Sequence, residues 1–161
     1  MDLGAFCGIH PVETVFPLDP PGVPVPFWQL VYHDSVLNYT AEGAYGAHGR
    51  EYILYVALFG LLPTQFDAES GRLSRELRGT YKSEMISHRF LTPVRVERNP
   101  DGSFRTHGVA ATVFDDGTEV VANFGDSDFR DGNRRIAGQD YLIFRSKSAE
   151  SATSSPKEDG R

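Results

Sequence analysis

The pattern of apolar and polar positions divides the chain into a helical part and a later part with strand periodicity. Residues 50–62 are almost uniformly apolar and are followed by Pro63, so we expect a buried helix that stops near Gly60. Residues 67–88 predict a second, amphipathic helix capped at Ser70, although Gly79 weakens it. Its apolar stripe recurs at every fourth position, at Leu73, Leu77, Tyr81 and Met85.

From residue 89 the apolar positions alternate with polar ones, as in strands with one buried face. Turn residues at 99–102 (NPDG) and 115–117 (DDG) separate these strands and predict hairpins. Residues 140–145 form a further short apolar run that is typical of a closing strand. The pattern therefore predicts a small antiparallel β-sandwich or sheet.

Residues 27–34 (FWQLVYHD) form a near-continuous apolar run that ends in polar groups. Such a run after prolines indicates a strand buried on both faces, as in a parallel barrel. Its polar end would then lie where barrel enzymes bind their substrates. The glycine-rich stretch that follows is typical of a rim loop.

The two ends of the chain differ from the middle. Residues 1–27 are rich in proline and predict little regular structure, yet they carry apolar side chains that need a surface to pack on. We therefore expect a preceding part of a larger protein. Residues 146–161 have almost no large apolar side chain, which predicts a disordered tail.

Charge and composition narrow the classes of function. The net charge of −6 and the pI near 5.3 argue against nucleic acid and anionic membranes as partners. No apolar run approaches the roughly 20 residues that span a bilayer. The single cysteine, Cys7, excludes an internal disulfide framework, and the localisation stays open. Metal-binding and phosphate-binding motifs are absent, so we expect neither a metal nor another cofactor.

A cluster after the apolar run holds the candidate binding residues. Aromatic faces stack on sugar rings, while carboxylates and amides bind hydroxyl groups. The alternative is structural: Asp34 would brace a loop and His33 would be a buried, satisfied histidine. The candidate substrate-binding residues are Trp28, Tyr32, His33, Asp34 and Asn38.

A second polar set lies in the rim loop, where Arg50 beside carboxylates could orient a substrate or simply face solvent. This set comprises Glu42, Tyr45, His48, Arg50 and Glu51. Glycoside hydrolysis usually needs two carboxyl groups, and only Asp34 has the strand-end position of such a group. We therefore assign no catalytic residue to this chain.

Four segments, taken in order, resemble the C-terminal region of endo-α-N-acetylgalactosaminidase-type glycoside hydrolases and related uncharacterised barrel proteins. They are residues 23–39, 53–66, 87–93 and 112–129. The resemblance implies a late strand and a closing helix of a (β/α)8 barrel, followed by a β-sandwich. It also implies a pocket role for Tyr32, His33 and Asp34, whereas the catalytic carboxylates of that family lie on earlier strands. The rim loop departs from the tryptophan-rich sequence of the family, which leaves the sugar specificity open.

The combined interpretation is an α+β fragment with three parts. Residues 1–88 would end a barrel of the (β/α)8 type, 89–145 would form the antiparallel β-sandwich, and 146–161 the tail. A whole barrel needs about 250 residues, so we expect this chain to contribute part of a carbohydrate pocket and to be inactive alone. Its expected partners are a carbohydrate and a missing N-terminal barrel region. The alternative is a non-catalytic carbohydrate-binding or structural β-domain.

Overall fold

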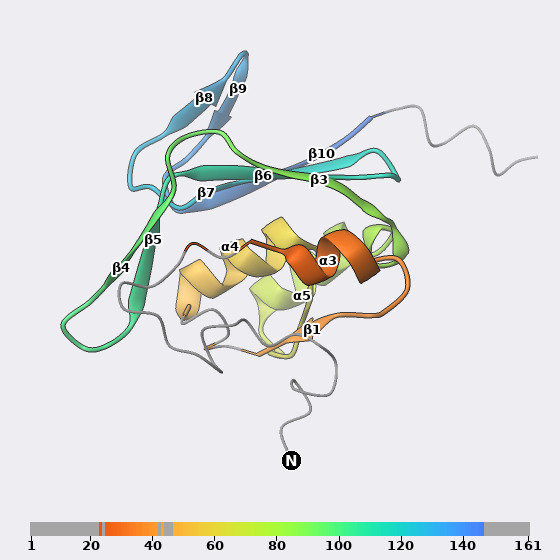
Figure 1. Cartoon of the computed structure of the whole chain (residues 1–161), viewed down its shortest axis with the longest axis horizontal. Helices are drawn as coiled ribbons and strands as arrows, with labels where there is room; N and C mark the ends of the chain where they lie inside the picture. The colour runs from red at the N-terminus through yellow and green to blue at the C-terminus, as the bar shows by residue number, and fades with distance from the viewer. Residues whose placement is uncertain (1–22, 24, 42, 44–46, 147–161) are drawn as a thin grey trace, which may run out of the picture.

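The computed structural model describes residues 23, 25–41, 43 and 47–146 of the chain. Within these residues the fold is α+β, with few helices and several antiparallel strand pairs (Figure 1). The helices are α3 (Phe27–Tyr32), α4 (Gly49–Phe59), α5 (Ala68–Glu76) and the short 3₁₀ helix η2 (Thr80–Lys82).

A four-stranded antiparallel sheet in the order β10-β7-β6-β3 forms one layer of the molecule. Consecutive strands β6 and β7 are joined by a tight turn in which Gly117 has a φ of +80°. Glycine adopts this left-handed conformation without a steric cost, as hairpin turns of this kind require. The strands of the sheet are β3 (Met85–Phe90), β6 (Val109–Phe114), β7 (Thr118–Asn123) and β10 (Asp140–Arg145).

The described residues form three smaller strand pairs besides this sheet. The hairpin of β4 (Arg95–Arg98) with β5 (Phe104–His107) and that of β8 (Phe129–Asp131) with β9 (Arg134–Ile136) are antiparallel. By contrast, β1 (Tyr39–Thr40) and β2 (Leu62–Pro63) run parallel, and α4 connects them along the chain. Along the chain, a β1–α4–β2 unit therefore precedes the strands of the antiparallel sheet.

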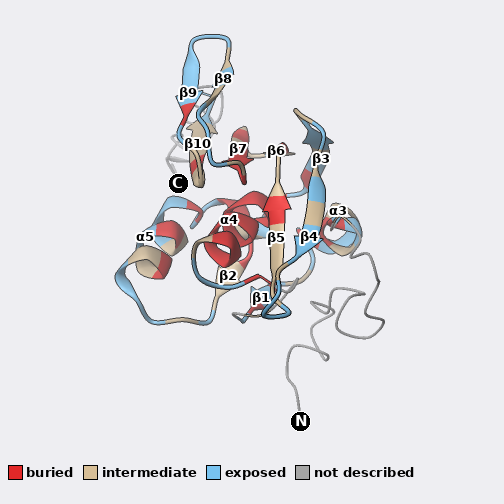
Figure 2. Cartoon of the chain, turned by 90° about the vertical axis from the view of Figure 1, so that its left-hand side faces the viewer, coloured by how far each residue is buried: buried red, intermediate tan, exposed pale blue. Residues whose placement is uncertain are grey.

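Helix α4 is the centre of the fold. It lies between the four-stranded sheet and the β1–β2 pair, and Figure 2 shows it as mostly buried. Every residue from Glu51 to Phe59 is buried, which explains why the sequence is apolar on all sides of this helix. The helix ends at Gly60, whose φ of +63° allows the next backbone N–H groups to bond back to the last turn.

The two faces of the sheet bury different sets of side chains. Phe114, Val120, Ala122 and Tyr141 face the helices and join the core around α4. On the opposite face a smaller apolar cluster forms under the β8–β9 hairpin. It contains Val109, Ala111, Val121 and Ile136, with Phe129, Leu142 and Phe144 packed against them. This alternation is the period of two seen in the sequence.

The prediction of a buried strand at residues 27–34 is wrong. Residues 27–32 form helix α3, with Pro26 at the position before its first turn. None of the described strands pairs with this segment, and its backbone groups bond locally within the helix. An apolar run of this length is compatible with either structure, and periodicity alone does not separate them.

The predicted helix over 67–88 is correct only in its first half. Helix α5 ends at Glu76, and Met85 already belongs to strand β3. Its cap is Asp67 instead of Ser70, because the Asp67 carboxylate accepts the N–H groups of Glu69 and Ser70 at 2.9 Å. The sheet therefore begins before residue 89.

The hairpins predicted at 99–102 and 115–117, the helix ending at Gly60 and the strand at 140–145 are confirmed. The sheet packs directly on α4, and helices and strands share one core. The proline-rich stretch up to residue 22, Cys7 and the predicted tail from residue 147 lie outside the described residues.

Candidate functional site

Three of the five predicted binding residues come together on one side of α3. Trp28 and Tyr32 are one helical turn apart, and their ring centroids lie 4.4 Å from each other. The indole N–H of Trp28 donates to Oδ1 of Asn38 at 3.1 Å. Asn38 is buried, and its own amide donates to the carbonyl of Val36 at 2.9 Å. We call Trp28, Tyr32 and Asn38 the aromatic cluster.

The two rings of the aromatic cluster reach the solvent, while Asn38 is buried beneath them. Asn38 holds the indole of Trp28 in one orientation, and the Trp28 ring in turn supports that of Tyr32. Tyr32 keeps 43% of its surface exposed, so it stays accessible. A fixed pair of aromatic rings beside an amide is an arrangement that suits the apolar face of a sugar ring.

The other two predicted residues have different surroundings. His33 is only 2% exposed, and its Nδ1 and Nε2 lie 2.7 Å from the Ser83 carbonyl and 3.0 Å from the Gly60 carbonyl. The ring therefore joins α3 to the end of α4 and to the segment before β3. Asp34 is exposed, and its carboxylate accepts the Ser35 hydroxyl at 2.9 Å. Among the described residues, neither side chain bonds to the aromatic cluster.

The second polar set is used to tie elements together. Arg50 donates to the Gln139 carbonyl at 2.6 Å and forms ion pairs with Glu69 and Asp140. Glu51 is buried and accepts the backbone N–H of Thr106 at 2.6 Å. These contacts fasten the first turn of α4 to α5, β5 and β10. His48 is exposed just before this helix, while Glu42 and Tyr45 lie outside the described residues.

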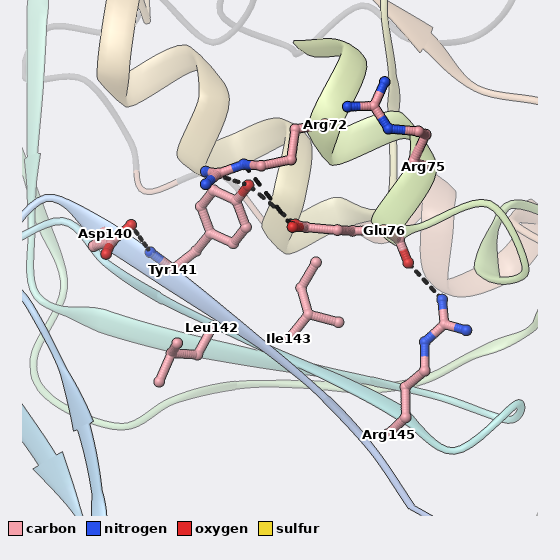
Figure 3. Close-up of a pocket in the computed structure, with 8 residues that line it drawn as sticks. All are labelled: Arg72, Arg75, Glu76, Asp140, Tyr141, Leu142, Ile143 and Arg145. Carbon is pink, nitrogen blue, oxygen red and sulfur yellow. Dashed lines mark hydrogen bonds and ion pairs between the residues drawn. The ribbon is translucent and has the colours of Figure 1, made fainter. Parts of the chain in front are cut away.

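A site that the sequence did not reveal lies between α5 and β10. This α5–β10 groove has a volume of about 730 Å³ (Figure 3). It combines guanidinium groups and carboxylates with an apolar floor. Its lining residues are Arg72, Arg75, Glu76, Asp140, Tyr141, Leu142, Ile143 and Arg145. The arginines at 72 and 75 are three positions apart on one helix, a spacing that places them on neighbouring turns. Nothing in the sequence, however, brings β10 beside them.

Tyr141 is the centre of the hydrogen bonds in the groove. Its hydroxyl accepts from Arg72 at 3.3 Å and donates to the Glu76 carboxylate at 3.4 Å. Burial raises the pKa of the Tyr141 phenol, and the negative charge of Glu76 raises it further. The phenol is therefore a donor at neutral pH. Arg145 donates to the backbone carbonyl of Glu76 at 2.5 Å and so closes the same edge.

The sequence matches no protein-family model and no curated protein. Within the described ranges there is no group of three or more histidine, cysteine or acidic residues that could hold a metal ion. In the same part of the chain, every helix is too short or too polar to cross a membrane. Function therefore has to be inferred from the geometry of the site itself.

Proposed function

We propose that this chain is the C-terminal part of a glycoside-hydrolase-like protein, in which it forms one wall of a carbohydrate pocket and braces that wall with its β-sheet. The observation that carries the proposal is the aromatic cluster. Trp28 and Tyr32 form a fixed aromatic surface, and Asn38 sets the orientation of the indole. Aromatic surfaces of this kind gain affinity for sugars by covering their C–H faces.

His33 has a positioning role in this proposal. Its ring contacts two backbone carbonyls in the interior and Phe114 at 5.0 Å between ring centroids. It therefore sets where α3 lies on the fold, and the exposed side of α3 carries Tyr32. Asp34 lies two positions after Tyr32 and is exposed, so its carboxylate remains available for a sugar hydroxyl.

The β1–α4–β2 unit supports a barrel origin for the first part of the chain. Two parallel strands joined by a helix are the repeating unit of a (β/α)8 barrel. The pairing covers only Tyr39 with Leu62 and Thr40 with Pro63, and parallel strands are normally parts of larger, covered sheets. Further parallel strands supplied by a barrel region would complete this pair.

An exposed apolar surface supports the same partner. Helix α3 packs against the edge strand β3, and both carry large apolar side chains on their solvent side. Phe27 is 75% exposed and Ile86 57% exposed. The set comprises Phe27, Val31, Ile86 and Phe90, and we call it the α3–β3 face. Exposed large apolar side chains on two packed elements are typical of an interface. We propose that the preceding barrel region covers it.

A purely structural β-domain is the second candidate. It is favoured by Arg50 and Glu51, whose contacts go to Gln139, Asp140 and Thr106 within the protein. In that case the aromatic cluster would only support the loop before β1. The two candidates differ in one measurable property, because only the first binds a sugar at Trp28.

Trp28 is the only tryptophan, so its fluorescence reports on the aromatic cluster directly. We expect N-acetylgalactosamine or galactose, titrated into the full chain, to change this fluorescence saturably, with weak affinity. The variant Tyr32→Ala should abolish the saturable change because it removes half of the aromatic surface. No hydrolysis of an aryl glycoside is expected from this chain alone.

The matched control is Tyr39→Ala, since Tyr39 is 46% exposed but lies outside the aromatic cluster. This variant should bind the sugars like the unmodified chain. A fluorescence signal that stays constant up to the solubility limit of both sugars would favour the structural β-domain. A change that Tyr32→Ala and Tyr39→Ala reduce equally would also contradict the proposed site.

A further inference from the structure

Basic side chains without an acidic partner are concentrated at one corner of the molecule. Most described arginines form ion pairs, for example Arg89 and Arg134 with Glu119. Four basic side chains near the end of α5 and the end of β10 have no carboxylate within ion-pair distance among the described residues. These are Arg75, Arg78, Lys82 and Arg145. Elsewhere in the described chain, only Arg98 and Arg130 share this property.

This concentration of positive charge adjoins the α5–β10 groove. Arg75 and Arg145 line the groove, and Figure 3 shows them on opposite sides of Glu76. The Glu76 carboxylate has its own cation and donor, because Arg72 lies 3.9 Å away and Tyr141 donates to it. Asp140 is likewise paired with Arg50. The carboxylates of the groove are therefore neutralised by other groups, while the charges of Arg75 and Arg145 are not.

The end of a helix attracts cations, and this accounts for part of the arrangement. Arg145 already donates to the last-turn carbonyl of Glu76. One such contact does not explain Arg75, Arg78 and Lys82, which gather in a chain whose net charge is −6. Uncompensated like charges repel one another, so their grouping beside a groove is costly unless an anion is bound there.

We propose that the α5–β10 groove binds a small ligand carrying an oxyanion, either a carboxylate or a phosphate or sulfate group. Arginine offers a planar fork of N–H donors that matches such groups, and both Arg75 and Arg145 have N–H donors left for it. The side chain of Ile143 and the ring of Tyr141, which face α5, supply apolar contacts for the remainder of the ligand. The groove volume of about 730 Å³ lies within the range of small-molecule pockets, which is about 300–1,000 Å³. The proposal is independent of sugar binding at Trp28.

The carboxylate of Asp116 lies next to the groove, and its negative charge opposes the binding of an anion there. Asp116 accepts the Thr80 hydroxyl at 2.9 Å and the Thr118 backbone N–H at 2.8 Å. Its Oδ2 and the guanidinium of Arg145 both lie beside Gly79. Replacing Asp116 with asparagine removes the negative charge, keeps Oδ1 as the acceptor for the Thr118 N–H, and places an amide N–H that can donate to the Thr80 hydroxyl. The variant should therefore bind anions more tightly.

The test is an NMR titration of the ¹⁵N-labelled full chain with sodium phosphate, sodium sulfate and sodium glucuronate, each at constant ionic strength. We expect saturable shifts at the amides of Glu76, Tyr141 and Arg145 with at least one of the three probes. Arg75→Gln and Arg145→Gln should each weaken binding about tenfold, and Asp116→Asn should strengthen it several-fold. The probe with the highest affinity shows which oxyanion the groove prefers.

Arg130→Gln is the matched control, because Arg130 is exposed on β8 and also lacks an acidic partner. This variant should bind like the unmodified chain. The side chain of Arg75 makes no hydrogen bond to the described residues, so its variant keeps the fold even if Arg145→Gln loosens the end of α5. Shifts that are absent, that sodium chloride reproduces, or that survive Arg75→Gln unchanged would each overturn the proposal.

Discussion

His88 on β3 is a histidine that the fold keeps neutral. Its Nδ1 lies 3.0 Å from the Thr112 hydroxyl, and its ring packs edge-on against Phe59 and Phe90. Its buried Nε2 has no hydrogen-bond partner among the described residues. Burial lowers the pKa of His88 from 6.5 to about 4, since a charged ring would lose its solvation there.

This shift predicts acid sensitivity with a defined sign. The unfolded chain takes up the His88 proton as the pH falls through 6.5, whereas the folded chain resists until about pH 4. The contribution of His88 to stability is therefore complete above pH 6.5 and is lost between pH 6.5 and 4. The loss should amount to about 1 to 3 kcal/mol, because one pKa unit corresponds to about 1.4 kcal/mol and the ring is partly exposed.

Urea unfolding at pH 7 and at pH 4.5 measures this loss. In the variant His88→Phe the aromatic contacts persist but the proton site is gone. The difference in unfolding free energy between the two pH values should shrink by at least about 1 kcal/mol. An identical pH dependence in both proteins would show that His88 does not drive the acid sensitivity.

At the scale of elements, the end of α4 depends on a glycine that has no room for a side chain. Gly60 has a φ of +63°, and a Cβ atom added there would lie 2.6 Å from His33 Nε2 and 2.9 Å from Phe114 Cζ. Both neighbours are buried, so neither can withdraw into solvent. The junction of α3, α4 and β6 therefore requires glycine at this position.

We expect Gly60→Ala to destabilise the protein by more than 3 kcal/mol, from the left-handed backbone and the two clashes together. The control is Gly132→Ala in the β8–β9 turn, where φ is +58° but no atom lies within 4 Å of the added Cβ. It should cost only about 1 to 2 kcal/mol. Chemical denaturation of both variants measures the difference, and equal losses would mean that the close approach at Gly60 is relieved cheaply.

Local signals in the sequence were sufficient for some elements and not for others. The turns at Asp101-Gly102 and Asp116-Gly117 specify hairpins through short-range chemistry, and Gly60 marks the end of α4 for the same reason. The β8–β9 hairpin has a similar turn signal in Gly132-Asn133, but its two strands are too short to show a period of two. Segment 27–32, by contrast, is apolar except for Gln29, so it shows neither the period of a strand nor that of a helix clearly.

The two candidate sites differ in the same way, because the residues of one are close together in the sequence and those of the other are not. Trp28, Tyr32 and Asn38 are near one another in the sequence, so a local cluster could be foreseen even though the element that carries it could not. The α5–β10 groove could not be foreseen, because Arg72 and Tyr141 are 69 positions apart and meet only through the register of the sheet. His33 was proposed for a ligand, yet its ring serves two interior carbonyls.

At the scale of the whole molecule, the α3–β3 face leaves much apolar surface in water. We expect the chain to self-associate through this face at micromolar concentrations. The double variant Phe27→Ser/Val31→Ser should be monomeric at the same concentrations, as measured by sedimentation velocity. The control is Phe66→Ser, which removes a fully exposed ring outside α3 and β3 and should leave the self-association unchanged.

Sedimentation of the unmodified chain as a single monomeric species would contradict this role of the α3–β3 face. Equal loss of self-association in the Phe27→Ser/Val31→Ser and Phe66→Ser variants would point to unspecific aggregation. Loss of self-association in the Phe27→Ser/Val31→Ser variant alone would instead identify α3 as part of the surface on which the proposed barrel region packs.

The central position of α4 also determines when the protein can fold during its synthesis. The helix is made early, but Phe114, Val120, Phe124 and Tyr141, which bury one side of it, come much later in the chain. Arg50 likewise has to wait for Asp140. Contacts this distant in sequence form slowly. On the ribosome, we therefore expect one side of α4 to stay uncovered until β6 and β7 have emerged, and to be covered completely only once β10 has followed.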